Sequence, residues 1–265
     1  MARGTILVGT EYEYDAISGH RINVLRNTDN VDRGSPWVMH FHGGGFTSGD
    51  HCNVPPNWQR EIDRGIVVIG VEYGKSPAVQ YPEMLSFAGL VRSYVAANFR
   101  KLKVDPNRFA VAGESVGGYL ALMAMRDLID VACCVAYYPV TNFATLASDF
   151  DPFITPRTDW EAAESGATHY LGFQIDTVDQ GEIATMTAAS AVGAISASSK
   201  PTFLAWSRAD SLVPSHQSVR VLSALQELEI EVEAREVIGD IHGWWLGEAV
   251  DEARCDFLSR HLQLS

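Results

Sequence analysis

Residues 108–125 read RFAVAGESVGGYLALMAM, and this stretch decides the fold. An apolar run of strand length, 108–113, leads into Gly113-Glu114-Ser115-Val116-Gly117, and a segment with helical spacing follows directly. The pattern G-x-S-x-G at a strand-to-helix junction is typical of a sharp turn that exposes the serine hydroxyl, because the glycines permit close backbone approach on either side. The first N–H groups of the helix also favour negative charge that develops beside the serine. The stretch therefore predicts Ser115 as a nucleophile.

Short apolar strands alternate with amphipathic helical segments on both sides of this unit. The chain predicts strands at 37–41, 66–73, 108–113, 131–140, 202–207 and 231–238, and helices at 53–64, 82–102, 117–128, 215–230 and 248–263. This alternation favours a mostly parallel sheet with helices on both faces, which is an α/β fold. Residues 105–107, Asp-Pro-Asn, are expected to form a turn after the second helix. Nearer the start, 5–14 and 21–27 alternate well enough to predict two antiparallel strands joined near Gly19.

One segment, 144–200, departs from the alternation because it has little strand character. Its middle, DWEAAESGATHYLGF, is compatible with one or two short helices. Long excursions between strands of α/β enzymes often build a lid or a substrate wall. No repeat or low-complexity linker divides the chain, so we expect a single domain over 1–265 with 144–200 as a small cap.

Composition and charge exclude several classes of protein. The residues are 46% hydrophobic and 20% charged, as in ordinary globular proteins, and the formal net charge is −13. A nucleic-acid partner would require a basic face, yet the largest basic cluster is the short run 100–103. Apolar runs such as 131–138 are too short to span a membrane. The absence of a signal-peptide pattern favours a cytoplasmic protein, and the oligomeric state is left open between a monomer and a homodimer.

A glycine-rich loop follows the first predicted parallel strand. His42-Gly43-Gly44-Gly45-Phe46 comes directly after 37–41 and lies upstream of the serine. Acyl transfer generates a tetrahedral oxyanion, and fixed backbone N–H donors around it supply several kcal/mol. We expect the N–H groups of Gly44, Gly45 and Val116 to form this oxyanion hole, and we expect His42 to hold the loop by hydrogen bonding.

A serine hydroxyl needs a neighbouring base to become nucleophilic. His242 is the best placed of the eight histidines, because its loop GDIHGWW follows the last predicted strand and ligands gather at that edge of an open α/β sheet. Asp210 follows the strand at 202–207, and the chain order Ser…Asp…His suits a residue that orients the imidazole. We expect Glu114, beside the serine, to be a structural hydrogen-bonding group.

Substrate contacts are harder to assign from sequence, because most aromatic residues are simply core. Phe46, Trp244 and Trp245 are the candidates nearest the predicted chemistry. Four cysteines form no C-x-x-C pair, and Cys133 and Cys134 lie in a predicted buried strand. Neither a metal-binding motif nor the G-x-G-x-x-G dinucleotide motif occurs, so no cofactor and no metal are expected.

Together, HGGGF, GESVGG, DSLVP and IHG resemble motifs of the α/β-hydrolase fold, in particular the hormone-sensitive-lipase-like esterases and the related kynurenine formamidases. The resemblance spans about residues 20–262. It implies an eight-stranded, mostly parallel sheet, no cofactor, and a triad in which Ser115 is the nucleophile, His242 the base and then acid, and Asp210 its orienting partner. Val116 departs from these esterases, which usually carry alanine there. The long N-terminal cap helices of many relatives also have no counterpart, so a lid would come mainly from 144–200.

Four functions are compatible with these motifs. The leading hypothesis is a serine hydrolase that cleaves a small or medium carboxylic ester through an acyl-enzyme. An arylformamidase or amidase is the second, and a non-hydrolytic biosynthetic enzyme of secondary metabolism, which cyclises, condenses or dehydrates a metabolite, is the third. An oxyanion hole would stabilise an enolate in such a reaction as well. A receptor without catalysis is the fourth, and a complete triad argues against it.

Overall fold

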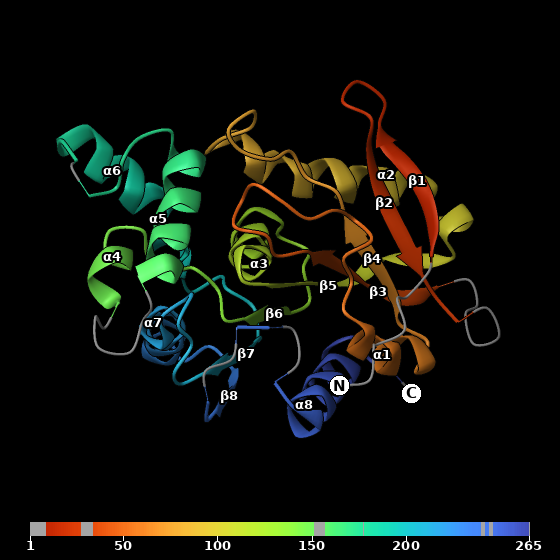
Figure 1. The fold of residues 1–265 in the computed structure, drawn as a ribbon. Coiled ribbons are helices and arrows are strands. Elements are labelled where there is room, and N and C mark those ends of the chain that lie inside the picture. Colours follow the sequence, from red (N-terminus) through yellow and green to blue (C-terminus); the bar gives the residue numbers. More distant parts are fainter. Residues whose placement is uncertain are drawn as a thin grey trace.

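Eight strands form one sheet in the order β1-β2-β4-β3-β5-β6-β7-β8 in the computed structural model (Figure 1), which describes residues 9–27, 34–150, 157–176, 178–239, 242–243 and 246–264. The strands are β1 (Thr10–Asp15), β2 (His20–Leu25), β3 (Ser35–Phe41), β4 (Val67–Val71), β5 (Val104–Glu114), β6 (Cys134–Tyr137), β7 (Thr202–Ser207) and β8 (Val232–Val237). β2 pairs antiparallel with β1 and β4, and the pairs from β4 through β8 are parallel. The predicted fold class is confirmed.

Helices cover both faces of the sheet. They are α1 (Gln59–Asp63), α2 (Ser86–Leu102), α3 (Val116–Asp127), α4 (Leu146–Asp149), α5 (Arg157–Leu171), α6 (Gln180–Ala189), α7 (Ser215–Glu227) and α8 (Glu248–His261), with short 3₁₀ turns at Pro56–Trp58, Glu83–Leu85 and Ala191–Ala194. In Figure 1, α1 and α8 lie side by side below the sheet, and α2 and α3 lie above it. The buried ion pair between Arg254 of α8 and Glu61 of α1 joins the first two. No helix in the described ranges is both long and apolar enough to cross a membrane.

The central strands are buried along their whole length. Every residue of β3, β4, β6 and β7 is buried, as expected for parallel strands covered on both faces. This rigid core holds the carboxyl ends of β5, β6 and β7 at one edge of the sheet, where the chain turns into loops.

Several element boundaries differ from the sequence prediction, among them the strand predicted at 131–140, which is β6 at Cys134–Tyr137. The predicted turn at 105–107 lies inside the irregular start of β5, where the N–H of Asn107 donates to the Asp105 side chain and the register with β3 shifts. The predicted helix at 53–64 is instead a 3₁₀ turn followed by α1, since Pro55 and Pro56 cannot donate helical hydrogen bonds. The strand predicted at 66–73 is shorter, at 67–71.

The segment between β6 and β7 forms helices and no strand within its described residues. It contains α4, α5 and α6 and the last 3₁₀ turn. α5 is tied to the main body at both ends: Ser211 donates to Asp159 at 2.7 Å, and the N–H of Tyr81 donates to the carbonyl of Tyr170 at 2.9 Å. This helix therefore stands over the carboxyl edge of the sheet.

Candidate active site

Ser115 occupies a strained turn between β5 and α3. Its φ of 56° and ψ of −121° lie outside the regions that L-residues normally adopt. A Cβ on Gly113 would lie 2.2 Å from the carbonyl oxygen of Gly117, and a Cβ on Gly117 would lie 2.0 Å from that of Phe41. Only glycine fits at either position, so the two glycines of the motif allow the turn to form.

The structure brings Ser115, His242 and Asp210 into one chain of hydrogen bonds. His242 Nε2 lies 3.1 Å from Ser115 Oγ, and His242 Nδ1 lies 2.8 Å from Asp210 Oδ2. The residues come from three separate loops, after β5, after β8 and after β7. This is the geometry in which an imidazole accepts the serine proton while a carboxylate holds the ring in the correct tautomer.

Asp210 is fixed by its own loop. Its Oδ1 accepts the N–H groups of Leu212 and Val213 at 2.9 and 2.8 Å, and its side chain is fully buried. A buried carboxylate with two backbone donors keeps a single orientation, because rotation would leave its lone pairs unsatisfied. The ring of Tyr138 packs 4.6 Å from that of His242 and supports the imidazole from the other side.

The glycine loop presents free N–H donors beside the serine. Gly44 and Gly45 have φ values of 127° and 59°, a conformation that favours glycine. The Gly44 carbonyl turns into the loop and accepts the N–H groups of Thr47 and Ser48. Among the described residues, no acceptor bonds the N–H of Gly44 or Gly45, and both glycines line the same pocket as Ser115 and Val116. These three N–H groups could therefore bind an oxyanion.

His42 holds this loop as a neutral imidazole. Burial lowers its pKa to about 4, so the ring carries one proton near neutral pH. The 2.6 Å contact between Nδ1 and the Gly43 carbonyl places that proton on Nδ1. The ring stacks on Tyr73 at 4.3 Å, and a Cβ on Gly49 would lie only 2.3 Å from it. The expected structural role of His42 matches these contacts.

The side chain of Glu114 bonds to residues of β3 and of the 3₁₀ turn before α1. It pairs with His40 Nε2 at 2.8 Å and accepts from Trp58 Nε1 at 3.4 Å. The Trp58 ring in turn packs against the guanidinium of Arg254, 4.3 Å from the ring centre. Glu114 thus anchors the end of β5 to the helical layer below, which is a structural role.

A pocket of about 500 Å³ opens over Ser115 and His242. Its walls are mostly apolar and come from the glycine loop, the loop after β6, the Asp210 loop and α5. Phe46, Val140, Leu146, Ala162, Ala163, Gly166, Ala167, Leu212 and Val213 are among the lining residues. A Cβ on Gly166 would approach the Gly45 carbonyl to 2.8 Å, so α5 packs directly on the glycine loop.

Of the three predicted substrate contacts, the structure describes only Phe46. Phe46 lines the pocket, yet it is 2% exposed and its ring stacks on Tyr170 at 4.1 Å. Trp244 and Trp245 lie outside the described residues. The sequence analysis expected a helical wall from 144–200 but named none of its lining residues, although the pairs Ala162/Gly166 and Ala163/Ala167 at i, i+4 spacing were a visible signal for a small-residue helix face.

Possible metal ligands lie outside this pocket. The described residues hold a group that could bind an ion, Glu11, His51 and Cys52, and none of the three lines the cavity over Ser115.

Comparison with known proteins points to one family. Residues 38–246 match the model of a family described as alpha/beta hydrolase fold. Esterase LipI of Mycobacterium tuberculosis is 29% identical over 148 residues, which cover 52% of this chain and 45% of the relative. Ethyl acetate hydrolase of Pseudomonas putida is 26% identical over 225 residues, covering 82% and 68%. The chain thus spans just under half the length of the first of these relatives.

A solved structure shares the fold over nearly the whole chain. A bacterial heroin esterase superposes with a TM-score of 0.78 at 22% identity, covering 97% of this chain and 84% of that one. At this level of identity the likeness shows a common fold.

Proposed function

The chain belongs to the alpha/beta hydrolase fold family, and from this premise we propose that it hydrolyses small or medium carboxylic esters through an acyl-enzyme on Ser115. The observation that carries the proposal is the hydrogen-bonded chain Ser115–His242–Asp210 at the floor of an apolar pocket. The esterase resemblance expected from the motifs is confirmed by the family match and by relatives named as esterases.

The proposed reaction proceeds in two halves. In the first, His242 Nε2 takes the proton of Ser115 as Oγ attacks the acyl carbon, and the N–H groups of Gly44, Gly45 and Val116 stabilise the oxyanion. His242 then gives its proton to the leaving alcohol. In the second half a water molecule, deprotonated by His242, attacks the acyl carbon. The bond from this carbon to Ser115 Oγ then breaks, His242 returns its proton to Oγ, and the carboxylic acid leaves. Asp210 stabilises the imidazolium in both halves.

The pocket supports an uncharged acyl group as the substrate. No Lys or Arg occurs among the lining residues that the structure describes, so a carboxylate on the acyl chain would have no counter-ion there. The net charge of −13 adds a general repulsion of anions. The small side chains of α5 leave room for a short or medium aliphatic chain.

We also propose that 1–265 is a single domain in which 144–200 acts as the cap, since α5 forms one wall of the pocket. We propose that the protein is cytoplasmic, because all four cysteines are free and disulfides are rare in that reducing compartment.

The test is the hydrolysis of p-nitrophenyl acetate and butyrate by the protein and by its Ser115→Ala variant. We expect a burst followed by steady turnover, and a loss of roughly 10⁴-fold or more in kcat/KM in the variant. Ser93→Ala, the same change on the surface of α2, is the matched control and should retain full activity. Cleavage of an N-formyl anilide with no cleavage of either ester would replace the proposal with an arylformamidase. Turnover that survives in Ser115→Ala would remove Ser115 from the mechanism.

A further inference from the structure

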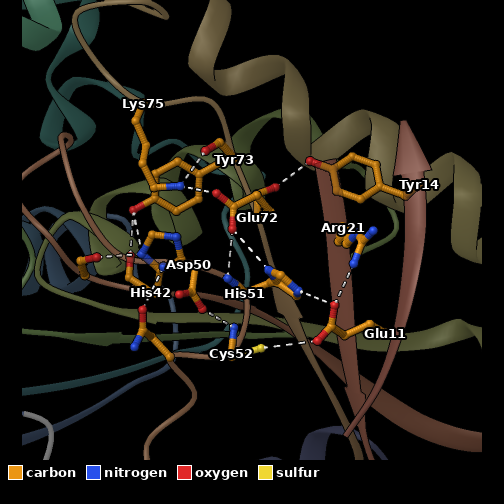
Figure 2. Close-up of polar contacts among 12 residues, drawn as sticks. Glu11, Tyr14, Arg21, His42, Asp50, His51, Cys52, Glu72, Tyr73 and Lys75 are labelled. Carbon is orange, nitrogen blue, oxygen red and sulfur yellow. Dashed lines mark hydrogen bonds and ion pairs between the residues drawn. The ribbon is translucent and has the colours of Figure 1, made fainter. Parts of the chain in front are cut away.

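A second polar cluster lies between the N-terminal hairpin and the far end of the glycine loop (Figure 2). Glu11 belongs to β1, His51 and Cys52 belong to the loop that begins at His42, and Glu72 directly follows β4. The mechanism proposed above uses none of these side chains. Their donor atoms are a thiol, an imidazole and carboxylates, which are the ligands that Zn²⁺ prefers.

Three of the residues converge on one point. His51 Nε2 lies 3.3 Å from Glu11 Oε2, and Cys52 Sγ lies 4.0 Å from Glu11 Oε1. One donor atom from each of the three residues lies within 4.8 Å of the other two. Donors bound to one tetrahedral zinc ion are about 3.3–3.7 Å apart, as follows from bond lengths near 2.0–2.3 Å. Side-chain shifts of about 1 Å would therefore complete a coordination shell.

The imidazole of His51 is oriented as in a metal site. Its Nδ1 lies 3.1 Å from Glu72 Oε2, and its backbone N–H donates to the same carboxylate oxygen at 3.0 Å. Its Nε2 is buried and makes no contact with hydrogen-bond geometry, although it faces Glu11. Metal-binding histidines commonly give their second N–H to a carboxylate, which fixes the tautomer and turns the free lone pair toward the ion. Glu72 supplies that carboxylate here.

The local charge favours a cation. Two carboxylates contact Cys52: Glu11 Oε1 lies 4.0 Å from its Sγ, and Asp50 Oδ1 accepts its backbone N–H at 2.7 Å. Arg21 pairs with Glu11 at 3.1 Å and Lys75 pairs with Glu72, but within the described part of the chain neither cation contacts Cys52. A bound divalent ion would offset the thiolate and the Glu11 carboxylate, and the thiol proton would pass to bulk water.

We propose that Glu11, His51 Nε2 and Cys52 Sγ bind one Zn²⁺ ion, with Glu72 positioning the imidazole and a water molecule in the fourth place. The thiolate and imidazole donors select zinc over Mg²⁺ or Ca²⁺, which prefer oxygen ligands. Glu11 is 45% exposed at its side chain, so an ion can enter from solvent. The ion would join β1 to the loop whose next residues, Asn53 and Pro55, line the pocket. None of the three ligands lines the pocket over Ser115, so the ion takes no part in the proposed ester hydrolysis.

The experiment uses the full chain without a histidine tag, freed of metal by a chelator and then titrated with Zn²⁺ in a calorimeter and with Co²⁺ in a spectrometer. We expect one ion per chain and, for Co²⁺, the charge-transfer band of a cobalt–thiolate bond. With Zn²⁺ at about a hundredfold excess over Kd, the Tm should rise by about 5 °C.

Paired variants separate a site from general charge effects. Cys52→Ser should abolish the thiolate band, and Glu11→Gln and His51→Gln should each weaken Zn²⁺ binding by about a hundredfold or more. Glu13→Gln, exposed on the same strand, and His261→Gln, a surface imidazole beside Glu231, should bind as the parent does. Circular dichroism verifies that each variant is folded.

Two results would overturn the proposal. One is a parent protein that binds no zinc, which would leave the cluster as an imidazole bridging two carboxylates. The other is zinc binding that survives unchanged in Cys52→Ser and Glu11→Gln. Both results are measurements of zinc binding, which does not depend on ester hydrolysis. The failure of one proposal would therefore leave the other standing.

Discussion

Two imidazoles, those of His242 and His51, each have a carboxylate at Nδ1 but differ in what lies at Nε2. His242 pairs with Asp210 at 2.8 Å and His51 pairs with Glu72 at 3.1 Å. The other nitrogen of His242 meets the hydroxyl of Ser115, whereas that of His51 faces Glu11 beside Cys52. Both sites thus contain a carboxylate–imidazole pair. Whether it activates a hydroxyl or offers a lone pair to a cation depends on the third residue.

The two carboxylates also differ in their surroundings. Asp210 is fully buried and is held by two backbone N–H groups, while the side chain of Glu72 is 19% exposed and pairs with Lys75. The first environment fixes one orientation for a reaction that needs it at every turnover. The second tolerates small movements, which an ion entering from solvent requires.

The largest expected effects come from replacing each carboxylate with its amide, because one replacement should affect ester hydrolysis and the other zinc binding. Asp210→Asn should lower kcat/KM for p-nitrophenyl butyrate by about 10⁴-fold, because the amide favours the wrong imidazole tautomer, and should leave zinc affinity unchanged. Glu72→Gln should weaken zinc binding by about 10- to 100-fold and leave hydrolysis intact. Ester kinetics and zinc calorimetry on both variants provide the check. Equal losses of hydrolysis in the two variants would contradict the comparison.

His42 lies on the loop between the two sites and should behave as a third kind of imidazole. Because its pKa is lowered from 6.5 to about 4, the unfolded chain takes up a proton between these values and the folded chain does not. Stability should therefore fall as the pH drops through this window, by about 2 kcal/mol from His42 at pH 5.

Urea unfolding at pH 7.5 and pH 5 measures this effect. The loss between the two pH values should be about 2 kcal/mol smaller in His42→Gln than in the parent. His169→Gln, an exposed imidazole on α5, serves as the control and should lose as much as the parent. The same pH dependence in His42→Gln as in the parent would argue against a neutral buried ring.

The pocket over Ser115 is bounded on one side by α5, which contributes none of the proposed zinc ligands. Ala163→Phe on α5 should fill part of the pocket and lower kcat/KM for p-nitrophenyl octanoate about tenfold more than for the acetate. Ala184→Phe on α6, exposed and away from the pocket lining, should leave this ratio unchanged. A constant ratio in Ala163→Phe would mean that the acyl chain lies elsewhere.

The smallest effect is expected for zinc removal on ester hydrolysis, because that effect requires the two sites to be coupled. Removal of zinc by a chelator should change kcat/KM for p-nitrophenyl acetate by less than about twofold at 25 °C, because no proposed zinc ligand lines the pocket. Assays with chelator and with added Zn²⁺ measure this directly. A large loss on chelation would give the ion a role in catalysis.

Local patterns were sufficient to predict the fold. β7 occupies the predicted residues 202–207, and α3 begins at the predicted turn after Ser115. Periodicity succeeds in these regions because strands buried on both faces are apolar throughout, and because the glycines of the serine turn have no side-chain alternative. The boundaries failed at Pro55 and at 105–107, where proline and register decide which hydrogen bonds form.

The sequence by itself determined the alternation of strands and helices, the serine turn and the glycine loop, since each depends on neighbours within a few residues, and the chain order of Ser115, Asp210 and His242 is part of the sequence itself. The tertiary structure alone decided what lies across space. The strand order β1-β2-β4 brings Glu11 to His51, and tertiary packing places α5 on the glycine loop. Contacts between residues forty or more positions apart depend on strand order and packing, and periodicity in a sequence carries neither.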